Sequence, residues 1–134
     1  MDAIRVHGLT KRYGDHVAVD GIGFTVQQGE AFGILGPNGA GKTTTLEMIE
    51  GLRKPDGGEV EVLGRPVWPD PRAIQSQIGV QLQSTTLFDR LTAHELLELF
   101  ARFYDRSDGS ARADQALQLV GLESKSGAYA GDMS

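Results

Sequence analysis

The segment GPNGAGKT at residues 36–43 constrains the fold of this chain more than any other feature. It fills the pattern G-x-x-x-x-G-K-[ST], follows the apolar run AFGIL at residues 31–35 and precedes a helix-like stretch over residues 43–52. A strand, a glycine-rich loop and a helix in this order turn successive backbone N–H groups inward around a phosphate, and the helix N-terminus adds unpaired donors. The sequence therefore predicts a strand–loop–helix unit that binds a nucleoside triphosphate.

The residue types in this loop suit that role. Glycines permit backbone conformations and close approaches that a Cβ atom would obstruct. Lys42 carries an ammonium able to reach the β- and γ-phosphates, and the Thr43 hydroxyl is a suitable Mg²⁺ ligand. A glycine-rich turn beside a surface lysine is the alternative, which the strand and helix context disfavours. The predicted nucleotide-binding residues are Gly36, Asn38, Gly39, Ala40, Gly41, Lys42, Thr43 and Thr44.

Composition limits the remaining possibilities. The chain has 134 residues, 40% hydrophobic and 23% charged, which is typical of one globular domain or most of one. A net charge of −5 argues against general affinity for nucleic acid or anionic lipid, so attraction for a nucleotide must be local. The absence of cysteine excludes a disulfide framework and agrees with a reducing compartment. No apolar run approaches the length of a membrane span, so any membrane connection is expected through a partner.

Hydrophobic patterns predict an α/β arrangement before a helical region. Two alternating segments form a predicted hairpin, and further strands and short helices follow. In the first predicted helix, Leu46, Ile49 and Leu52 recur at spacing three, which favours a helix. The predicted strands are 3–9, 17–26, 30–35, 59–63 and 78–82, and the predicted helices are 43–52 and 71–77.

After residue 83 the pattern becomes helical. TAHE at residues 92–95 fits a capping box, in which the Thr92 hydroxyl and the Glu95 carboxylate satisfy each other's backbone donors. Behind it, Leu96, Phe100 and Phe103 form an apolar stripe that predicts packing rather than base stacking. A second stripe contains Ala113, Ala116, Leu117 and Val120, closed by Gly121.

Four ordered segments together resemble the ATP-binding subunit of ABC transporters, and the resemblance covers the whole chain. It implies an α/β fold with a P-loop NTPase core, an N-terminal antiparallel β-subdomain and the start of an inserted helical subdomain. The expected boundary places the β-subdomain and core at about 1–83 and the helical part at about 84–134. The segments are KRYG at 11–14, VAVDG at 17–21, GPNGAGKTT at 36–44 and IGVQLQ at 78–83.

The resemblance assigns further site residues. In that family an aromatic residue after the first strand stacks on adenine, and Tyr13 holds that place; the alternative is a tyrosine packed on the hairpin. A glutamine at the end of a core strand helps ligate Mg²⁺ and reports nucleotide state to the helical lobe. Gln83 matches it best, Gln81 is the second candidate on the same strand face, and a solvated loop glutamine is the third interpretation. Lys42 and Gln83 are thus the expected catalytic residues, and Thr43 and Gln83 the metal ligands.

Other parts of the family's machinery lie beyond its helical lobe: a signature loop of the type LSGGQ, an apolar strand ending in Asp-Glu, and a switch histidine. This chain ends in GDMS at residues 131–134, whose last two residues match the start of that signature. The resemblance therefore implies an N-terminal part of the domain that binds Mg-ATP but turns it over poorly. His7, His16 and His94 precede the expected place of the switch histidine and are interpreted as structural or solvated.

For the intact protein, the resemblance implies a head-to-tail dimer of ATP-binding subunits. Its ATP hydrolysis would drive export through a transmembrane permease subunit, from a peripheral position on the cytoplasmic face of the membrane. Residues 41–52 are similar to multidrug exporters, and no direct nucleic-acid contact is expected. The alternatives are a non-transport ABC-type ATPase acting on ribosomes or DNA, or a nucleotide-binding stub without catalysis. A GTPase or small kinase would share the loop, but the GTPase base reader N-K-x-D is absent, because Asn38 is the only asparagine.

Overall fold

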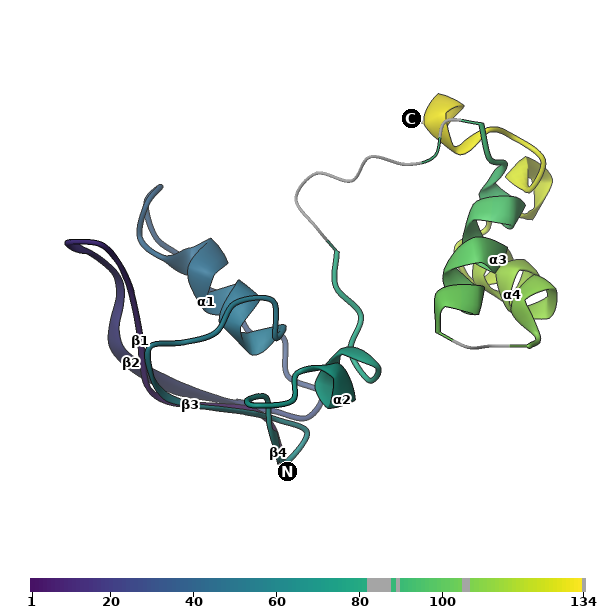
Figure 1. The fold of residues 1–134 in the computed structure, drawn as a ribbon. Coiled ribbons are helices and arrows are strands. Elements are labelled where there is room, and N and C mark those ends of the chain that lie inside the picture. Colours follow the sequence, from purple (N-terminus) through teal and green to yellow (C-terminus); the bar gives the residue numbers. More distant parts are fainter. Residues whose placement is uncertain (82–87, 89, 105–106, 134) are drawn as a thin grey trace. The chain divides into compact units, whose positions relative to one another are not determined.

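The computed structural model describes residues 1–81, 88, 90–104 and 107–133 (Figure 1). Contacts within the chain divide it into two compact units, Met1–Gln81 and Leu82–Ser134. In the described parts of both units, no helix is long and apolar enough to cross a membrane.

The first unit is built on a four-stranded antiparallel sheet with the strand order β2-β1-β3-β4. β1 (Asp2–Tyr13) and β2 (His16–Gln27) form a long hairpin, closed by the pairing of Tyr13 with His16. β3 (Gly57–Val62) pairs with the other edge of β1, and the short β4 (Arg65–Pro66) pairs with β3. The predicted hairpin and the predicted strand at residues 59–63 are confirmed, and both hairpin strands are longer than the hydrophobic alternation indicated.

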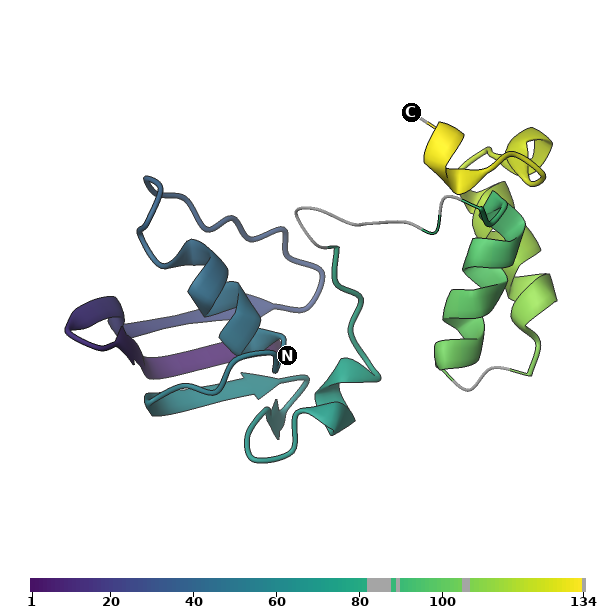
Figure 2. The same ribbon diagram turned by 45° about the horizontal axis from the view of Figure 1, so that its top comes forward.

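A hydrophobic core lies between this sheet and two helices. α1 (Lys42–Ile49) contacts β2 and β3, and Figure 2 shows it lying across the sheet, with the short α2 (Arg72–Gln75) nearby. α1 buries Thr45, Met48 and Ile49, whereas Leu46 and Leu52 are 45% and 58% exposed. Of the three residues at spacing three, Ile49 is therefore buried, Leu46 is partly exposed and Leu52 lies beyond the end of α1. The fully buried core side chains are Leu9, Met48, Val67 and Ile74.

The predicted strands at residues 30–35 and 78–82 are not present in the described residues. Residues 30–37 and 78–81 are extended or irregular without strand pairing. A strand exists only through its partner, and among the described residues the strands pair solely with one another in the antiparallel sheet. Leu35 is accordingly 94% exposed. The Phe32 ring stacks on Phe24 of β2 at 5.0 Å between centroids, so this one residue of the segment contacts the hairpin.

The second unit is a helical hairpin of α3 (Ala93–Phe103) and α4 (Gly109–Leu119). The predicted capping box is confirmed: the Glu95 N–H donates to the Thr92 hydroxyl at 3.2 Å, and the Thr92 N–H donates to the Glu95 carboxylate at 2.9 Å. The backbone N–H and the hydroxyl of Thr92 both donate to the Glu95 carboxylate and lower the pKa of Glu95. Two 3₁₀ turns follow, Glu123–Lys125 and Ala130–Asp132.

Fewer side chains of the predicted apolar stripe are buried between the two helices than the sequence pattern indicated. Leu96 is buried against the α4 side, where Ala113 and Leu117 are buried too, but Phe100 and Phe103 are 43% and 67% exposed. The packing prediction for these two rings is wrong within the described residues, because two helices offer each other only one contact face. The rings instead meet edge to face at 6.0 Å between centroids.

We expect Thr92→Ala to destabilise the helical unit by about 1 kcal/mol, because it leaves a helix N-terminal N–H without its side-chain acceptor. Urea unfolding followed by circular dichroism at 222 nm measures the loss. Thr92→Ser keeps the hydroxyl and is the matched control, with near wild-type stability. Equal loss in both variants would show that the methyl group, not the cap, matters.

Candidate functional site

The glycine-rich loop of residues 36–41 connects the extended segment to α1 and is exposed. Gly39 and Gly41 have φ of +83° and +80°, the left-handed region that glycine adopts without strain. The Ala40 N–H donates to the Pro37 carbonyl at 3.2 Å, which closes a tight turn. The loop is thus a short, glycine-dependent bend whose backbone is open to solvent.

Gly41 is the tightest point of this bend. A Cβ atom on Gly41 would overlap the backbone carbonyl oxygen of Ala18 in β2 and would lie 3.2 Å from the Cγ2 of Val19. No side chain fits between the loop and the hairpin here. Gly39, by contrast, has no atom within 4 Å of the same position, so only its backbone conformation calls for glycine.

Lys42 folds its side chain back over the loop. Its Nζ donates to the carbonyl oxygens of Gly36 at 2.8 Å and Pro37 at 2.7 Å. An ammonium has three N–H donors, so this arrangement still allows a contact with a phosphate oxygen. The positive charge of Lys42 therefore sits at the loop itself.

The N-terminus of α1 is suited to an anion. Gly41 is its N-cap, no side chain caps the helix, and no acidic residue lies in its first turn. α3 differs, because the Thr92 hydroxyl and the Glu95 carboxylate accept from backbone N–H groups at its N-terminus. Uncapped N–H groups and the positive end of the helix dipole favour a negatively charged ligand.

Tyr13 lies at the end of β1 and is 42% exposed. The Cζ atom of Arg53 lies 5.4 Å from the ring centroid and the Nζ of Lys11 lies 5.9 Å from it. These distances are in the range of cation–π interactions. The ring is therefore flanked by positive charge and keeps exposed surface, rather than being buried in the hairpin.

Carboxylates hold both of these cations in place. Asp56 accepts from Lys11 Nζ and from the Arg12 N–H, each at 2.8 Å, and these two hydrogen bonds lower the pKa of Asp56. Glu47 of α1 accepts from the Arg53 Nε and raises the pKa of Arg53. Neither Asp56 nor Glu47 is among the predicted site residues, because a single sequence carries no signal for a contact such as that between residues 11 and 56.

Of the two predicted metal ligands, Thr43 is among the described residues and Gln83 is not. Thr43 is exposed in the first turn of α1, so its hydroxyl can serve as an oxygen ligand. Gln83 lies outside the described residues; Gln81, the second candidate, is exposed and belongs to no strand. No group of three or more acidic, histidine or cysteine side chains suited to a metal occurs among the described residues. A single hydroxyl donor such as that of Thr43 fits Mg²⁺ that arrives with a nucleotide, because Mg²⁺ typically uses few protein ligands plus phosphate oxygens.

The histidines do not gather at the loop. His94 pairs with Asp114, 3.2 Å between Nε2 and Oδ1, and so links α3 to α4. His7 and His16 are exposed on the hairpin strands. Their surroundings agree with the structural or solvated roles predicted for them.

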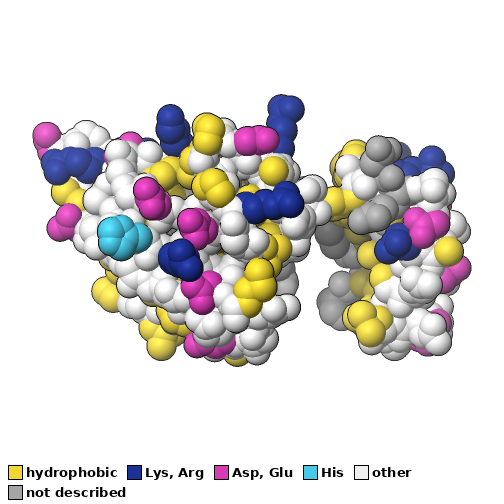
Figure 3. All heavy atoms as spheres, turned by 90° about the horizontal axis from the view of Figure 1, so that it is seen from below, with side chains coloured by type: hydrophobic (Ala, Val, Ile, Leu, Met, Phe, Trp, Pro, Cys, Tyr) yellow, Lys and Arg dark blue, Asp and Glu magenta, His cyan; other side chains and the backbone are white. Residues whose placement is uncertain are grey.

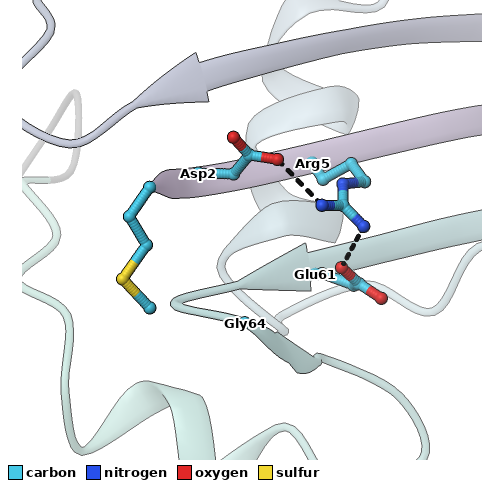
Figure 4. Close-up of a pocket in the computed structure, with 5 residues that line it drawn as sticks. Asp2, Arg5, Glu61 and Gly64 are labelled. Carbon is cyan, nitrogen blue, oxygen red and sulfur yellow. Dashed lines mark hydrogen bonds and ion pairs between the residues drawn. The ribbon is translucent and has the colours of Figure 1, made fainter.

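A separate hollow of about 260 Å³ lies at the N-terminal end of β1 (Figure 4). The Arg5 guanidinium bridges Asp2 at 2.8 Å and Glu61 at 3.2 Å there. Both pairs are substantially exposed, and such surface pairs contribute little to stability. Figure 3 likewise shows basic and acidic side chains intermixed over one face. No residue of the loop lines this hollow, so it is not part of the candidate site.

Comparison with known proteins decides the family. Residues 19–134 match the family described as ABC transporter. The chain belongs to the ABC transporter family. This confirms the resemblance drawn from the ordered motifs and excludes the GTPase and small-kinase alternatives.

The relatives of this ABC transporter family member include proteins named Nod factor export ATP-binding protein I. The protein of that name from Burkholderia pseudomallei (strain K96243) is 44% identical over 94% of this chain and 42% of its own length. The one from Rhizobium sp. (strain N33) is 40% identical over 98% of this chain and 44% of its own length. The chain therefore spans less than half the length of these relatives.

Solved structures agree with the fold class. An ATP-binding subunit of an ABC transporter superposes with a TM-score of 0.82 at 28% identity, covering 98% of this chain and 56% of that one. An ATP-binding cassette in its ADP conformation gives a TM-score of 0.84 at 26% identity, covering 100% of this chain and 59% of that one. The predicted α/β P-loop NTPase fold is confirmed.

We expect Gly41→Ala to destabilise the first unit by roughly 2–5 kcal/mol, because it adds a clash with β2 to the strain of a left-handed alanine. Gly39→Ala, which adds only the strain, should cost about 1–2 kcal/mol. Urea unfolding of the two variants gives the comparison. Equal losses would contradict the close approach of Gly41 to Ala18.

Proposed function

We propose that this chain is the nucleotide-binding part of an ABC-type ATPase and that it binds Mg-ATP at the loop of residues 36–44. One observation carries the proposal: the Lys42 ammonium is held at the Gly36 and Pro37 carbonyls beside the uncapped N-terminus of α1. Positive charge and free N–H donors at one exposed bend are what a triphosphate requires. Membership of the ABC transporter family supports ATP as the ligand.

Each site residue has a proposed role. The backbone N–H groups of the loop and of Thr43 and Thr44 bind phosphate oxygens, and Lys42 neutralises the β- and γ-phosphates. Tyr13 offers its ring to adenine while its hydroxyl remains in water. Gln83 is proposed as a further metal ligand and coupling contact. The proposed nucleotide-binding set is Tyr13, Gly36, Asn38, Gly39, Ala40, Gly41, Lys42, Thr43 and Thr44.

The chemistry served by this site is in-line attack of water on the γ-phosphate. Catalysis of this step is mostly positioning and charge neutralisation, and bound Mg²⁺ supplies additional positive charge on the phosphate oxygens. In this proposal the loop amides and Lys42 orient the phosphates, and the Thr43 hydroxyl is a ligand of the metal. The 134 residues contain no apolar strand followed by Asp-Glu to polarise the water, so we propose that this chain binds ATP far better than it cleaves it.

For the whole protein we propose a dimeric ATPase that drives export through a transmembrane permease subunit. It would lie peripherally at the cytoplasmic face of the membrane. The relatives' names, which specify export of Nod factor, support transport over a ribosome- or DNA-associated role. They also favour an exporter of Nod factor type over the multidrug type predicted from residues 41–52. The head-to-tail arrangement of two ATP-binding subunits is part of the same proposal.

Isothermal titration of the chain with Mg-ATP tests the binding site. We expect Lys42→Ala to weaken binding by roughly 10- to 100-fold, because it removes a charge-assisted contact to phosphate. Lys125→Ala, an exposed lysine in the 3₁₀ turn of the helical unit, should bind as the wild type does. Equal affinity of wild type and Lys42→Ala would refute the proposed site.

Turnover is tested separately by phosphate release from the purified chain. We expect little or no release above background at saturating Mg-ATP. Robust release that Lys42→Ala abolishes would show that the 134 residues suffice for hydrolysis and would contradict the proposed division between binding and cleavage.

A further inference from the structure

The position of Arg53 follows from the way α1 ends. Gly51, with φ of +73°, turns the chain out of the helix after the C-cap residue Glu50. The N–H groups of Leu52 and Arg53 both donate back to the carbonyl oxygen of Glu47, at 2.8 and 3.1 Å. The backbone of Arg53 is therefore fixed to the last turns of α1.

The Arg53 side chain is fixed at its other end as well. Its Nε donates to the Glu47 carboxylate, so one residue of α1 holds both the backbone and the guanidinium. From there the guanidinium carbon lies over the Tyr13 ring at 5.4 Å from the centroid. Arg53 thus bridges two elements far apart in sequence: α1, which begins at the phosphate loop, and the exposed end of β1.

A clamp holds the end of β1 to the chain segment that carries Arg53. The Asp56 N–H donates to the Thr10 carbonyl at 3.0 Å, and the Asp56 carboxylate accepts from the Arg12 N–H and the Lys11 ammonium. Lys11 also donates to the Lys54 carbonyl at 2.8 Å. Tyr13 follows immediately after the clamped residues, so the same contacts hold the Tyr13 backbone and the segment whose guanidinium lies above its ring.

We propose that Arg53 is a positioning residue for the adenine site: by holding the Tyr13 ring from α1, it fixes the aromatic platform at a set place relative to the phosphate loop. This inference rests on the proposed function, in which Tyr13 receives the base. A ring at an exposed strand end would otherwise have to be ordered when the nucleotide binds, at a cost in conformational entropy. A platform ordered beforehand avoids that cost.

A comparison of two ligands, Mg-ATP and Mg-tripolyphosphate, distinguishes the positioning role of Arg53 from a direct contact between Arg53 and phosphate. Arg53→Met keeps an unbranched stem and removes the charge. We expect it to weaken Mg-ATP binding about two- to fivefold, the range of an exposed cation–π interaction, and to leave the affinity for Mg-tripolyphosphate, which has no base, unchanged. Arg53→Lys keeps a cation and should restore most of the ATP affinity.

Two further variants complete the experiment. Arg5→Met removes an arginine that is also exposed and paired with carboxylates, at a place apart from the loop, and should bind both ligands as the wild type does. Tyr13→Leu should weaken ATP binding but not tripolyphosphate binding. Because Arg53 acts through Tyr13, adding Arg53→Met to Tyr13→Leu should weaken ATP binding no further.

The outcomes separate this inference from the function on which it rests. If Tyr13→Leu lowers ATP affinity and Arg53→Met does not, the positioning role is wrong and the adenine site stands. Equal loss of ATP and tripolyphosphate in Arg53→Met, a gain in ATP affinity, or an additive double variant would each overturn the inference too. If Tyr13→Leu leaves ATP binding unchanged while Lys42→Ala weakens it, the adenine role of Tyr13 and the role of Arg53 both fail. If the wild type binds neither ligand, the proposed function fails.

Discussion

The conformation of the glycine-rich loop at residues 36–41 depends on the close approach of Gly41 to the Ala18 carbonyl of β2. Gly41 is the N-cap of α1, so the residue that lets the loop lie on the hairpin also decides where the helix begins and where its first N–H groups point. Its left-handed conformation then places Lys42 so that the side chain reaches back to the Gly36 and Pro37 carbonyls. One close backbone approach therefore sets the positions of the N–H donors and the cation together.

The opposite end of α1 connects this loop to the aromatic end of β1. α1 is short, and it ends in a left-handed glycine that returns the chain toward the hairpin. Glu47 and Asp56 then anchor the two cations around Tyr13. A nucleotide spanning the loop and the ring would thus contact two sites whose separation is set by a single helix and its cap.

Sequence reasoning succeeded where the signal was local. The hairpin of β1 and β2 followed from alternation, the capping box from Thr92 and Glu95, and the family from ordered motifs around the glycine-rich loop. It failed where structure depends on distant partners. The segment at residues 30–35 has the apolar pattern of a strand, yet pairing is what makes a strand, and no described strand pairs with it. Phe100 and Phe103 have helical spacing, but one packed helix face covers Leu96 and leaves them exposed. Arg53 and Asp56 were missed because their partners are tens of residues away or approach from another element.

We propose that the loop of residues 36–44 binds a triphosphate while Tyr13 receives the base. Two-dimensional ¹H–¹⁵N NMR of the chain during titration with Mg-ATP tests it most directly, since it reports every backbone N–H separately. We expect large shifts with both Mg-ATP and Mg-tripolyphosphate for the loop and helix amides of Gly39, Gly41, Lys42, Thr43 and Thr44. A shift at Tyr13 is expected with Mg-ATP alone. Unchanged loop amides at saturating nucleotide, or shifts confined to α3 and α4, would contradict it.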